Sequence, residues 1–196
     1  MRLARWLMLT GMLFGCSLTC INAQERWQRL PPERDVQFYA PRNKLEEFES
    51  RGSTLLIKGR TWVATLRAQG GNARVEATDI RDADDSSRAT GVTITLTASA
   101  SEVRCLIDYD EIDHLVKAFD TMAKADESMT KLSHFEVHYR TRADLEIVVF
   151  KQLSGGVAAA VEGGYLDRSR LLLTLEEFTR LRWMIVQAKE KLDEIK

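Results

Sequence analysis

The sequence carries an internal repeat at a spacing of 66 residues. The segment RCLIDYDEI at 104–112 aligns with RLLLTLEEF at 170–178, and the apolar positions that follow keep the same spacing in both copies. Self-similarity at a fixed offset indicates that one supersecondary unit occurs twice. We therefore expect the chain to fold as two copies of one structure.

Each copy has the pattern of a strand that runs directly into a helix. An apolar run ends at Asp108 in the first copy and at Thr174 in the second, and both residue types favour the N-cap of a helix. Glu111 and Glu177 follow three residues later, which is the capping-box spacing. We predict that these four residues have a structural role at the helix starts. The apolar stripes of the two helices that follow are Ile112, Leu115, Val116, Phe119 and Met122, and Phe178, Leu181, Ile185, Ala188, Leu192 and Ile195.

Four β-strands are expected before each helix, because short apolar runs are separated by turn residues. On one of them, Val92, Ile94 and Leu96 alternate with threonines, which predicts a half-buried strand. A further short strand is expected at 54–58 and a short helix at 44–51. The eight principal strands are expected at 61–67, 74–81, 92–97, 103–107, 134–141, 144–151, 157–162 and 169–173.

This pattern predicts an α+β protein of two tandem ββββα repeats, with antiparallel sheets that are each covered by a helix. Neither repeat is large, so we expect the two to pack together as an intramolecular pseudo-dimer. The predicted organisation is a signal peptide at 1–23, a polar leader with a short helix at 24–52, a first repeat at 53–125 and a second repeat at 126–196.

The first 23 residues have the composition of a bacterial export signal. Arg2 and Arg5 precede an apolar run that is shorter than a membrane span, and a polar stretch follows Ala23. Cleavage near Ala23 would make the protein periplasmic or secreted. Two alternatives stay open: LFGC at 13–16 resembles a lipobox, which would anchor the protein as a lipoprotein at Cys16, and the segment could stay as an uncleaved anchor.

Charge and cysteine content argue against several classes of protein. Without residues 1–23 the chain has 26 basic and 29 acidic residues, a net charge of −3. Residues 51–125 carry 10 basic against 11 acidic residues and 126–196 carry 11 against 12, which argues against nucleic acid as a partner. Only Cys105 then remains, so no intramolecular disulfide is expected. Its alternation with Val103 and Ile107 predicts a buried, inert thiol.

Three groups of side chains are candidates for a metal site or a catalytic site. None of them has the spacing or setting that such a site needs, so we predict no metal, no cofactor and no catalytic residue. Two histidines four residues apart on a strand are ~13 Å apart, too far to share one ion. The acidic loop lacks the glycine and distal glutamate of an EF-hand, and carboxylates at a helix start suit the helix dipole as well as they suit acid-base catalysis. The three groups are His134, Glu136 and His138; Asp79, Asp82, Asp84 and Asp85; and Asp108, Asp110, Glu111 and Asp113.

The last helix carries a possible interaction surface. Trp183 lies off its apolar stripe, beside Arg180 and Arg182. Exposed tryptophan and arginine are enriched at protein interfaces. We therefore predict these three residues as a surface for a partner.

The layout of four antiparallel strands and a helix, repeated over residues 54–195, resembles the Whirly family of single-stranded-DNA-binding proteins. The segment LLTLEEF at 172–178, followed by Leu181, resembles the strand-to-helix junction of the related transcriptional coactivator domains. The resemblance implies DNA binding through basic and aromatic residues on an exposed sheet. The signal segment and IDYDEI at 107–112 are also similar to exported bacterial proteins without an assigned activity.

The leading hypothesis from the sequence is an exported, non-enzymatic binding or scaffold protein. It would act through a sheet face or through Trp183, on a protein or a component of the cell envelope. The alternative is a single-stranded nucleic-acid-binding protein of Whirly-like fold. A third hypothesis is an enzyme that uses the carboxylates near Asp108.

Overall fold

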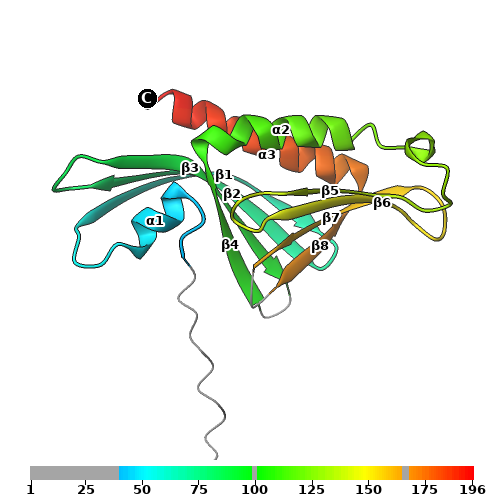
Figure 1. The fold of residues 1–196 in the computed structure, drawn as a ribbon, viewed down its shortest axis with the longest axis horizontal. Helices are drawn as coiled ribbons and strands as arrows, with labels where there is room; N and C mark the ends of the chain where they lie inside the picture. Colours follow the sequence, from blue (N-terminus) through cyan, green and yellow to red (C-terminus); the bar gives the residue numbers. More distant parts are fainter. Residues whose placement is uncertain (1–39, 99–100, 165–167) are drawn as a thin grey trace, which may run out of the picture. The chain divides into compact units, whose positions relative to one another are not determined.

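Two antiparallel sheets of four strands each make up the β-structure of the part of the chain that is described (Figure 1). The computed structural model describes residues 40–98, 101–164 and 168–196. The predicted signal peptide, its alternative at Cys16 and most of the predicted leader lie outside these residues. The first sheet has the order β1 (Leu56–Ala68), β2 (Gly71–Asp82), β3 (Arg88–Ala98) and β4 (Ser101–Asp108); the second has β5 (Glu136–Arg140), β6 (Glu146–Lys151), β7 (Val157–Gly163) and β8 (Ser169–Leu173).

The helices are α1 (Lys44–Ser50), α2 (Tyr109–Met122) and α3 (Leu175–Asp193), with a 3₁₀ turn η2 at Glu127–Met129. Helix α2 follows β4 and helix α3 follows β8, so the order is ββββα twice. The α+β class and the two ββββα repeats predicted from the sequence are therefore confirmed.

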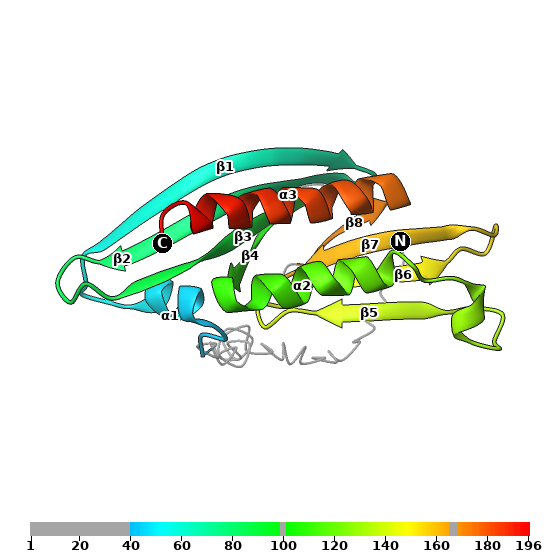
Figure 2. The same ribbon diagram turned by 90° about the horizontal axis from the view of Figure 1, so that it is seen from above.

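Helix α3, which ends the second repeat, covers the sheet of the first repeat. Helix α3 packs against β1, β2 and β3, whereas α2 packs against β3, β4, β5 and α3 (Figure 2). A hydrogen bond between the two sheets explains this placement. The Leu172 amide donates to the carbonyl of Gln69 at 3.0 Å, which holds the end of β8 beside the end of β1. Helix α3 then starts over the first sheet.

One hydrophobic core runs through both repeats. Phe119 of α2 and Phe178 of α3 are fully buried, with ring centroids 4.6 Å apart. The same cluster includes inward residues of both sheets, such as Val75 and Ile147. The two repeats thus share their apolar interior, as expected for a pseudo-dimer.

Two local expectations differ from the structure. The separate strand expected at 54–58 is the first part of β1, which continues through a register shift between Trp62 and Ala64. Strand β3 is buried on both faces rather than half-buried, since Thr93 and Thr95 are almost fully covered. On that second face, α1 packs against β3 and β4.

Helix α1 is held on this face by a second, smaller apolar cluster. Leu45 and Phe48 are buried against Ile80, Ala89 and Leu106. The Asn43 side chain accepts from the Glu46 amide and caps the helix. Glycine at position 91 of β3 leaves room for Leu45.

Candidate functional site

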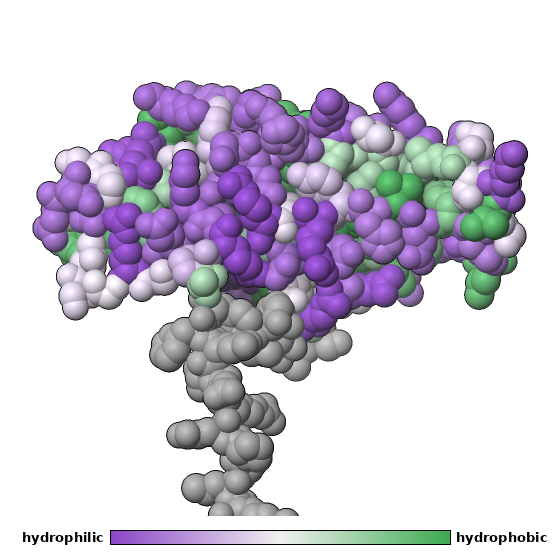
Figure 3. All heavy atoms as spheres, in the orientation of Figure 1, coloured by the Kyte–Doolittle hydropathy of each residue, from purple (hydrophilic) through white to green (hydrophobic). Residues whose placement is uncertain are grey.

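The outer face of the first sheet, opposite α3, brings together basic, aromatic and hydroxyl side chains. The strand register places Trp62 beside Glu76 and Thr93, and forms a row from Thr65 through Arg74 and Thr95 to Arg104. In the space-filling view, hydrophilic residues predominate over the region of the first sheet and α1 (Figure 3). Among the described residues of this face, the basic ones are Lys58, Arg60, Arg67, Arg74 and Arg104, and the acidic ones are Glu76, Asp82, Glu102, Asp108 and, from α1, Glu49.

Three of these cations converge on one carboxylate. Oxygen Oε1 of Glu49 lies 3.2 Å from Nζ of Lys58, 3.7 Å from Nη2 of Arg60 and 3.0 Å from Nη2 of Arg104. Lys58 and Arg60 belong to β1, at one edge of the sheet, and Arg104 belongs to β4, at the other. This cluster of Lys58, Arg60, Arg104 and Glu49 therefore has three positive charges around a single negative charge.

Small residues in the middle of the sheet make this convergence possible. Between the edge strands, β2 and β3 present Thr78, Gly91 and Thr93 on the outer face. The hydroxyls of Thr78 and Thr93 bond to each other at 2.7 Å, so neither engages the cations. Long side chains from both edges can then extend over these small residues and meet at Glu49.

The cations determine the ionisation of Glu49. Partial burial of the carboxyl acts to raise its pKa, but the hydrogen bonds and charges of Arg104 and Lys58 outweigh burial and hold the pKa below its usual value. Glu49 is therefore an anion over the normal pH range and acts as the counterion of this cluster.

Two polar atoms beside the cluster lack a hydrogen-bond partner among the described residues. They are Oγ1 of Thr95, whose residue is 1% exposed, and Nε of Arg74, which is opposite Thr95 in the register. Nε of Arg74 lies 3.6 Å from Oε2 of Glu76, beyond hydrogen-bonding distance. Both atoms are buried and so depart from the usual rule that buried polar groups in native proteins are satisfied.

Trp62 adds an aromatic surface to the same face. The side chain is 62% exposed, although tryptophan is usually largely buried. Its Nε1 donates to Oγ1 of Thr65 at 3.3 Å, which orients the ring over β1. Sequence reasoning did not single out Trp62, and only its position on a polar strand could have drawn attention to it.

The two predicted helix starts differ in the structure. Thr174 and Glu177 form the full capping box expected for α3. Asp108 occupies the N-cap position of α2 but makes no capping hydrogen bond, and this part of the prediction is wrong. Its buried carboxylate instead accepts from the amides of Lys44 and Leu45, at 2.9 and 3.0 Å, and so caps α1.

Glu111 also has a tertiary role rather than a capping one. Its carboxylate accepts from the amide of Arg142 at 2.9 Å and from Nε of Arg142 at 3.3 Å. Asp110 accepts from Nη2 of Arg142 at 2.6 Å, which holds the pKa of Asp110 below its usual value. These acids fasten the turn between β5 and β6 to the start of α2, so they are engaged in structure.

Replacing Asp108 by alanine should therefore cost more stability than removing the true cap. The variant would leave two amides of α1 without their acceptor, and we expect a loss of about 2 kcal/mol. Thr174→Ala is the matched change at α3 and should cost about 1 kcal/mol. Urea unfolding of both variants gives the comparison. A smaller loss for Asp108→Ala than for Thr174→Ala would mean that Asp108 does not anchor α1.

The predicted interaction surface is on α3, which packs on the inner face of the first sheet, opposite the outer face described above. Trp183 is 53% exposed and Arg180 is exposed. Arg182 pairs with Asp120 of α2, with Nη2 and Oδ2 at 2.9 Å, and so joins the two helices. The three predicted residues thus separate into an exposed pair and one helix-to-helix contact.

The other sequence candidates have partners of their own. His138 lies between Glu136 at 3.0 Å and Glu146 at 3.1 Å, and both carboxylates raise its pKa, with Glu146 the larger cause. His134 precedes β5, which begins at Glu136. No group of three metal-ligating side chains occurs in the described ranges.

The acids of the predicted loop bond to separate neighbours: Asp79 to Arg81 and Arg88, Asp82 to Arg51 and the Asp84 amide, and Asp85 to Ser87.

Cys105 is buried, as predicted. Its burial raises the pKa of the thiol to about 12, so the nucleophilic thiolate is absent at neutral pH. A side chain at Gly163 would come within 2.6 Å of its sulfur, which shows how closely the two repeats pack there.

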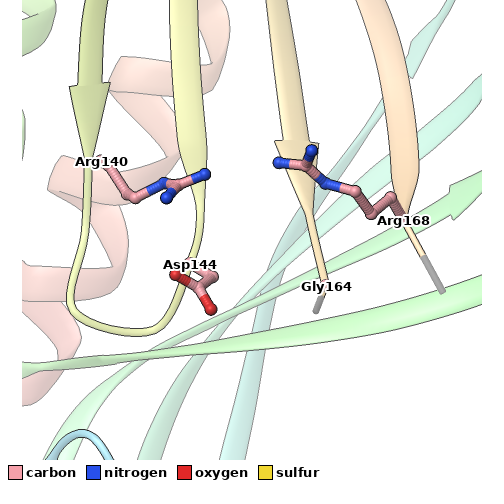
Figure 4. A pocket seen from close by; sticks show the side chains of 4 residues that line it. All are labelled: Arg140, Asp144, Gly164 and Arg168. Atoms are coloured by element: carbon pink, nitrogen blue, oxygen red, sulfur yellow. The ribbon is translucent and has the colours of Figure 1, made fainter. Parts of the chain in front are cut away.

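The second sheet also has an outer face, but its charges are balanced. A hollow of about 180 Å³ at one end is lined by Arg140, Asp144, Gly164 and Arg168, and the two guanidinium groups point toward one another (Figure 4). Arg140 pairs with Glu146 at 3.2 Å, and Arg168 pairs with Glu162 at 2.8 Å. Asp144 is paired with Arg42. Further along, the outward residues of this sheet are apolar: Val148, Phe150, Ala158, Ala160 and Leu172.

Comparison with known proteins finds no matching family model, no matching curated protein and no matching solved structure. Within residues 40–98, 101–164 and 168–196, no helix combines the length and apolar character needed to cross a bilayer. The functional argument therefore rests on the side chains of this chain alone.

Proposed function

We propose that this protein is an exported, non-enzymatic binding protein that recognises acidic peptide segments of a partner protein on the outer face of its first sheet. Export is inferred from the sequence of residues 1–23. The observation that carries the binding role is the convergence of Lys58, Arg60 and Arg104 on a single carboxylate. The excess positive charge there suits an acidic ligand.

The form of the surface favours an extended ligand over a small molecule. The cations Lys58, Arg60 and Arg104 and the exposed ring of Trp62 lie on the two edge strands, β1 and β4, so they span the width of the sheet face. An acidic peptide lying across the strands could place carboxylates on the cations and an apolar side chain on Trp62. Tryptophan and arginine are the residues most often found at the energetic centre of such interfaces.

A second candidate function is single-stranded nucleic-acid binding, in line with the Whirly-like layout. The specific observation that favours it is Trp62, because an exposed aromatic ring beside cations can stack with a base. The near-neutral charge of each repeat argues against it.

Binding of a fluorescently labelled oligoglutamate peptide to the full chain tests the proposal. We expect binding that weakens as salt is added, and a loss of about fivefold in affinity for Arg104→Gln. Arg180→Gln removes the same charge from the far side of the first sheet and should leave affinity unchanged.

Three results would count against this function. Absence of binding at low salt would reject it. Weakening by Arg180→Gln or Trp183→Ala, but not by Arg104→Gln, would move the site to α3. Tighter binding of a labelled oligothymidylate of equal charge would favour the nucleic-acid candidate.

A further inference from the structure

Glu49 is an acidic residue at the C-terminal end of α1, where an acid is unfavourable. It lies in the last turn of α1, where the helix dipole favours cations, and α1 has no basic residue in that turn. The helix itself is fixed by Asn43, Asp108 and the apolar side chains Leu45 and Phe48. Anchoring α1 therefore does not depend on Glu49, whose ion pairs need another explanation.

The contacts of Glu49 leave most of the cluster's bonding capacity unused. Lys58, Arg60 and Arg104 all meet the same oxygen, Oε1, and the contact to Arg60 is an ion pair at 3.7 Å without a hydrogen bond. A guanidinium offers five N–H donors and binds carboxylates best through two parallel bonds. In the described part of the chain, the guanidinium of Arg104 has Glu49 as its one hydrogen-bond acceptor. A freely positioned carboxylate could bond better than Glu49 does.

We propose that Lys58, Arg60 and Arg104 form a carboxylate-binding site that Glu49 fills in the free protein and leaves when an acidic side chain of a partner binds. This inference rests on the proposed function and specifies the ligand's chemistry. The site already holds a carboxylate, so its dimensions suit one. The three cations are partly exposed, with 36% of each side chain accessible, so a ligand can reach them.

The surroundings of the site indicate how the ligand continues. Thr95 is between Arg104 and Arg74 in the register, and Thr65 follows Arg74 in the same row. Trp62 donates to Thr65 at the end of that row. A peptide whose carboxylate replaces Glu49 would thus cross the strands along this row, from Arg104 toward Trp62.

Competition by an internal anion has a measurable signature. Occupancy by Glu49 lowers the apparent affinity by the fraction of molecules in which the cations are free. Replacing Glu49 by glutamine removes the competing charge and keeps the shape of the side chain. We expect Glu49→Gln to bind the labelled oligoglutamate roughly tenfold more tightly than the full wild-type chain does.

Glu47→Gln is the matched control. Glu47 is on the same helix and pairs with Arg51 rather than with the cluster, so this variant makes the same charge change elsewhere. Its affinity should match wild type. The double variant Glu49→Gln/Arg104→Gln should lose the gain, and Glu49→Ala should repeat it; melting temperatures establish that each variant is folded.

The outcomes separate this inference from the proposed function. Wild-type binding with an unchanged Glu49→Gln affinity would overturn the inference alone. An equal gain from Glu47→Gln would show a general effect of net charge and would also overturn it. Failure of both wild type and Glu49→Gln to bind would reject the proposed function together with the inference, because the cations are then free and still do not hold carboxylates.

Discussion

Replacing Phe178 by alanine is expected to lower the free energy of unfolding by about 3–5 kcal/mol. Phe178 is 1% exposed and packs on Phe119, which is 0% exposed, with a centroid distance of 4.6 Å and an angle of 35° between the rings. Truncation removes a large apolar side chain from water-free packing and leaves a cavity between α2 and α3. Urea unfolding followed by circular dichroism measures the loss.

The position of this pair makes the prediction a test of the shared core as well. Phe119 belongs to the first repeat and Phe178 to the second, so the double variant should show a coupling of about 0.5–1.5 kcal/mol between the two substitutions. Leu175→Ala, on an exposed residue of the same helix, should change stability by less than about 0.5 kcal/mol. Two separate unfolding transitions in wild type, with only one of them affected, would contradict a single core.

The strands could be predicted because their side chains alternate over most of their length. The run of Val92, Ile94 and Leu96 indicates β3 directly, and its hydrogen-bonded bounds are only a few residues wider. The first part of β1 is expected only as a separate short strand at 54–58, because Lys58, Gly59 and Arg60 are exposed and do not alternate. Pairing with β2, from Leu56 opposite Asp82 onward, joins the two predicted segments into one strand, and no local signal reports that continuity.

Which helix covers which sheet could not be read from periodicity. The apolar stripe of α3 shows that one face is buried, but any sheet of the right shape could bury it. The choice is made by a contact between Gln69 and Leu172, which are distant in the sequence. Asp108 failed as a cap for the same reason: a residue type that suits an N-cap can equally bind the start of another helix, here Lys44 and Leu45.

The net charge of each repeat gave no indication of the candidate site. Each repeat is nearly neutral, and this near-neutrality is the main sequence argument against nucleic acid as a partner. The fold sorts the charges: register brings Arg60 and Arg104 from opposite edges to one side of the sheet, and α1 adds Glu49 from 55 residues away from Arg104.

Gly91→Ala is expected to destabilise the protein by about 3 kcal/mol, near the upper end of the range for overpacking. A Cβ atom at position 91 would lie 2.0 Å from the carbonyl oxygen of Ile107 and 2.7 Å from Cδ1 of Leu45. The Ile107 carbonyl belongs to the backbone and cannot rotate away as a flexible side chain can, so β3 and β4 must separate. The contact with Leu45 must also displace α1 from the sheet. Gly59→Ala is the control, because its Cβ would meet its nearest neighbour, Asp79, at an ordinary 3.8 Å.

The same variant connects the fold to the proposed site. Because Leu45 and Glu49 are on one short helix, displacing Leu45 should also pull Glu49 from Lys58, Arg60 and Arg104. In the fraction of Gly91→Ala that stays folded, we therefore expect tighter oligoglutamate binding, in the direction of Glu49→Gln, whereas Gly59→Ala should keep wild-type affinity. Thermal unfolding and anisotropy titration of the two glycine variants measure both effects. Weaker binding by folded Gly91→Ala would mean that α1 supports the ligand site instead of occupying it.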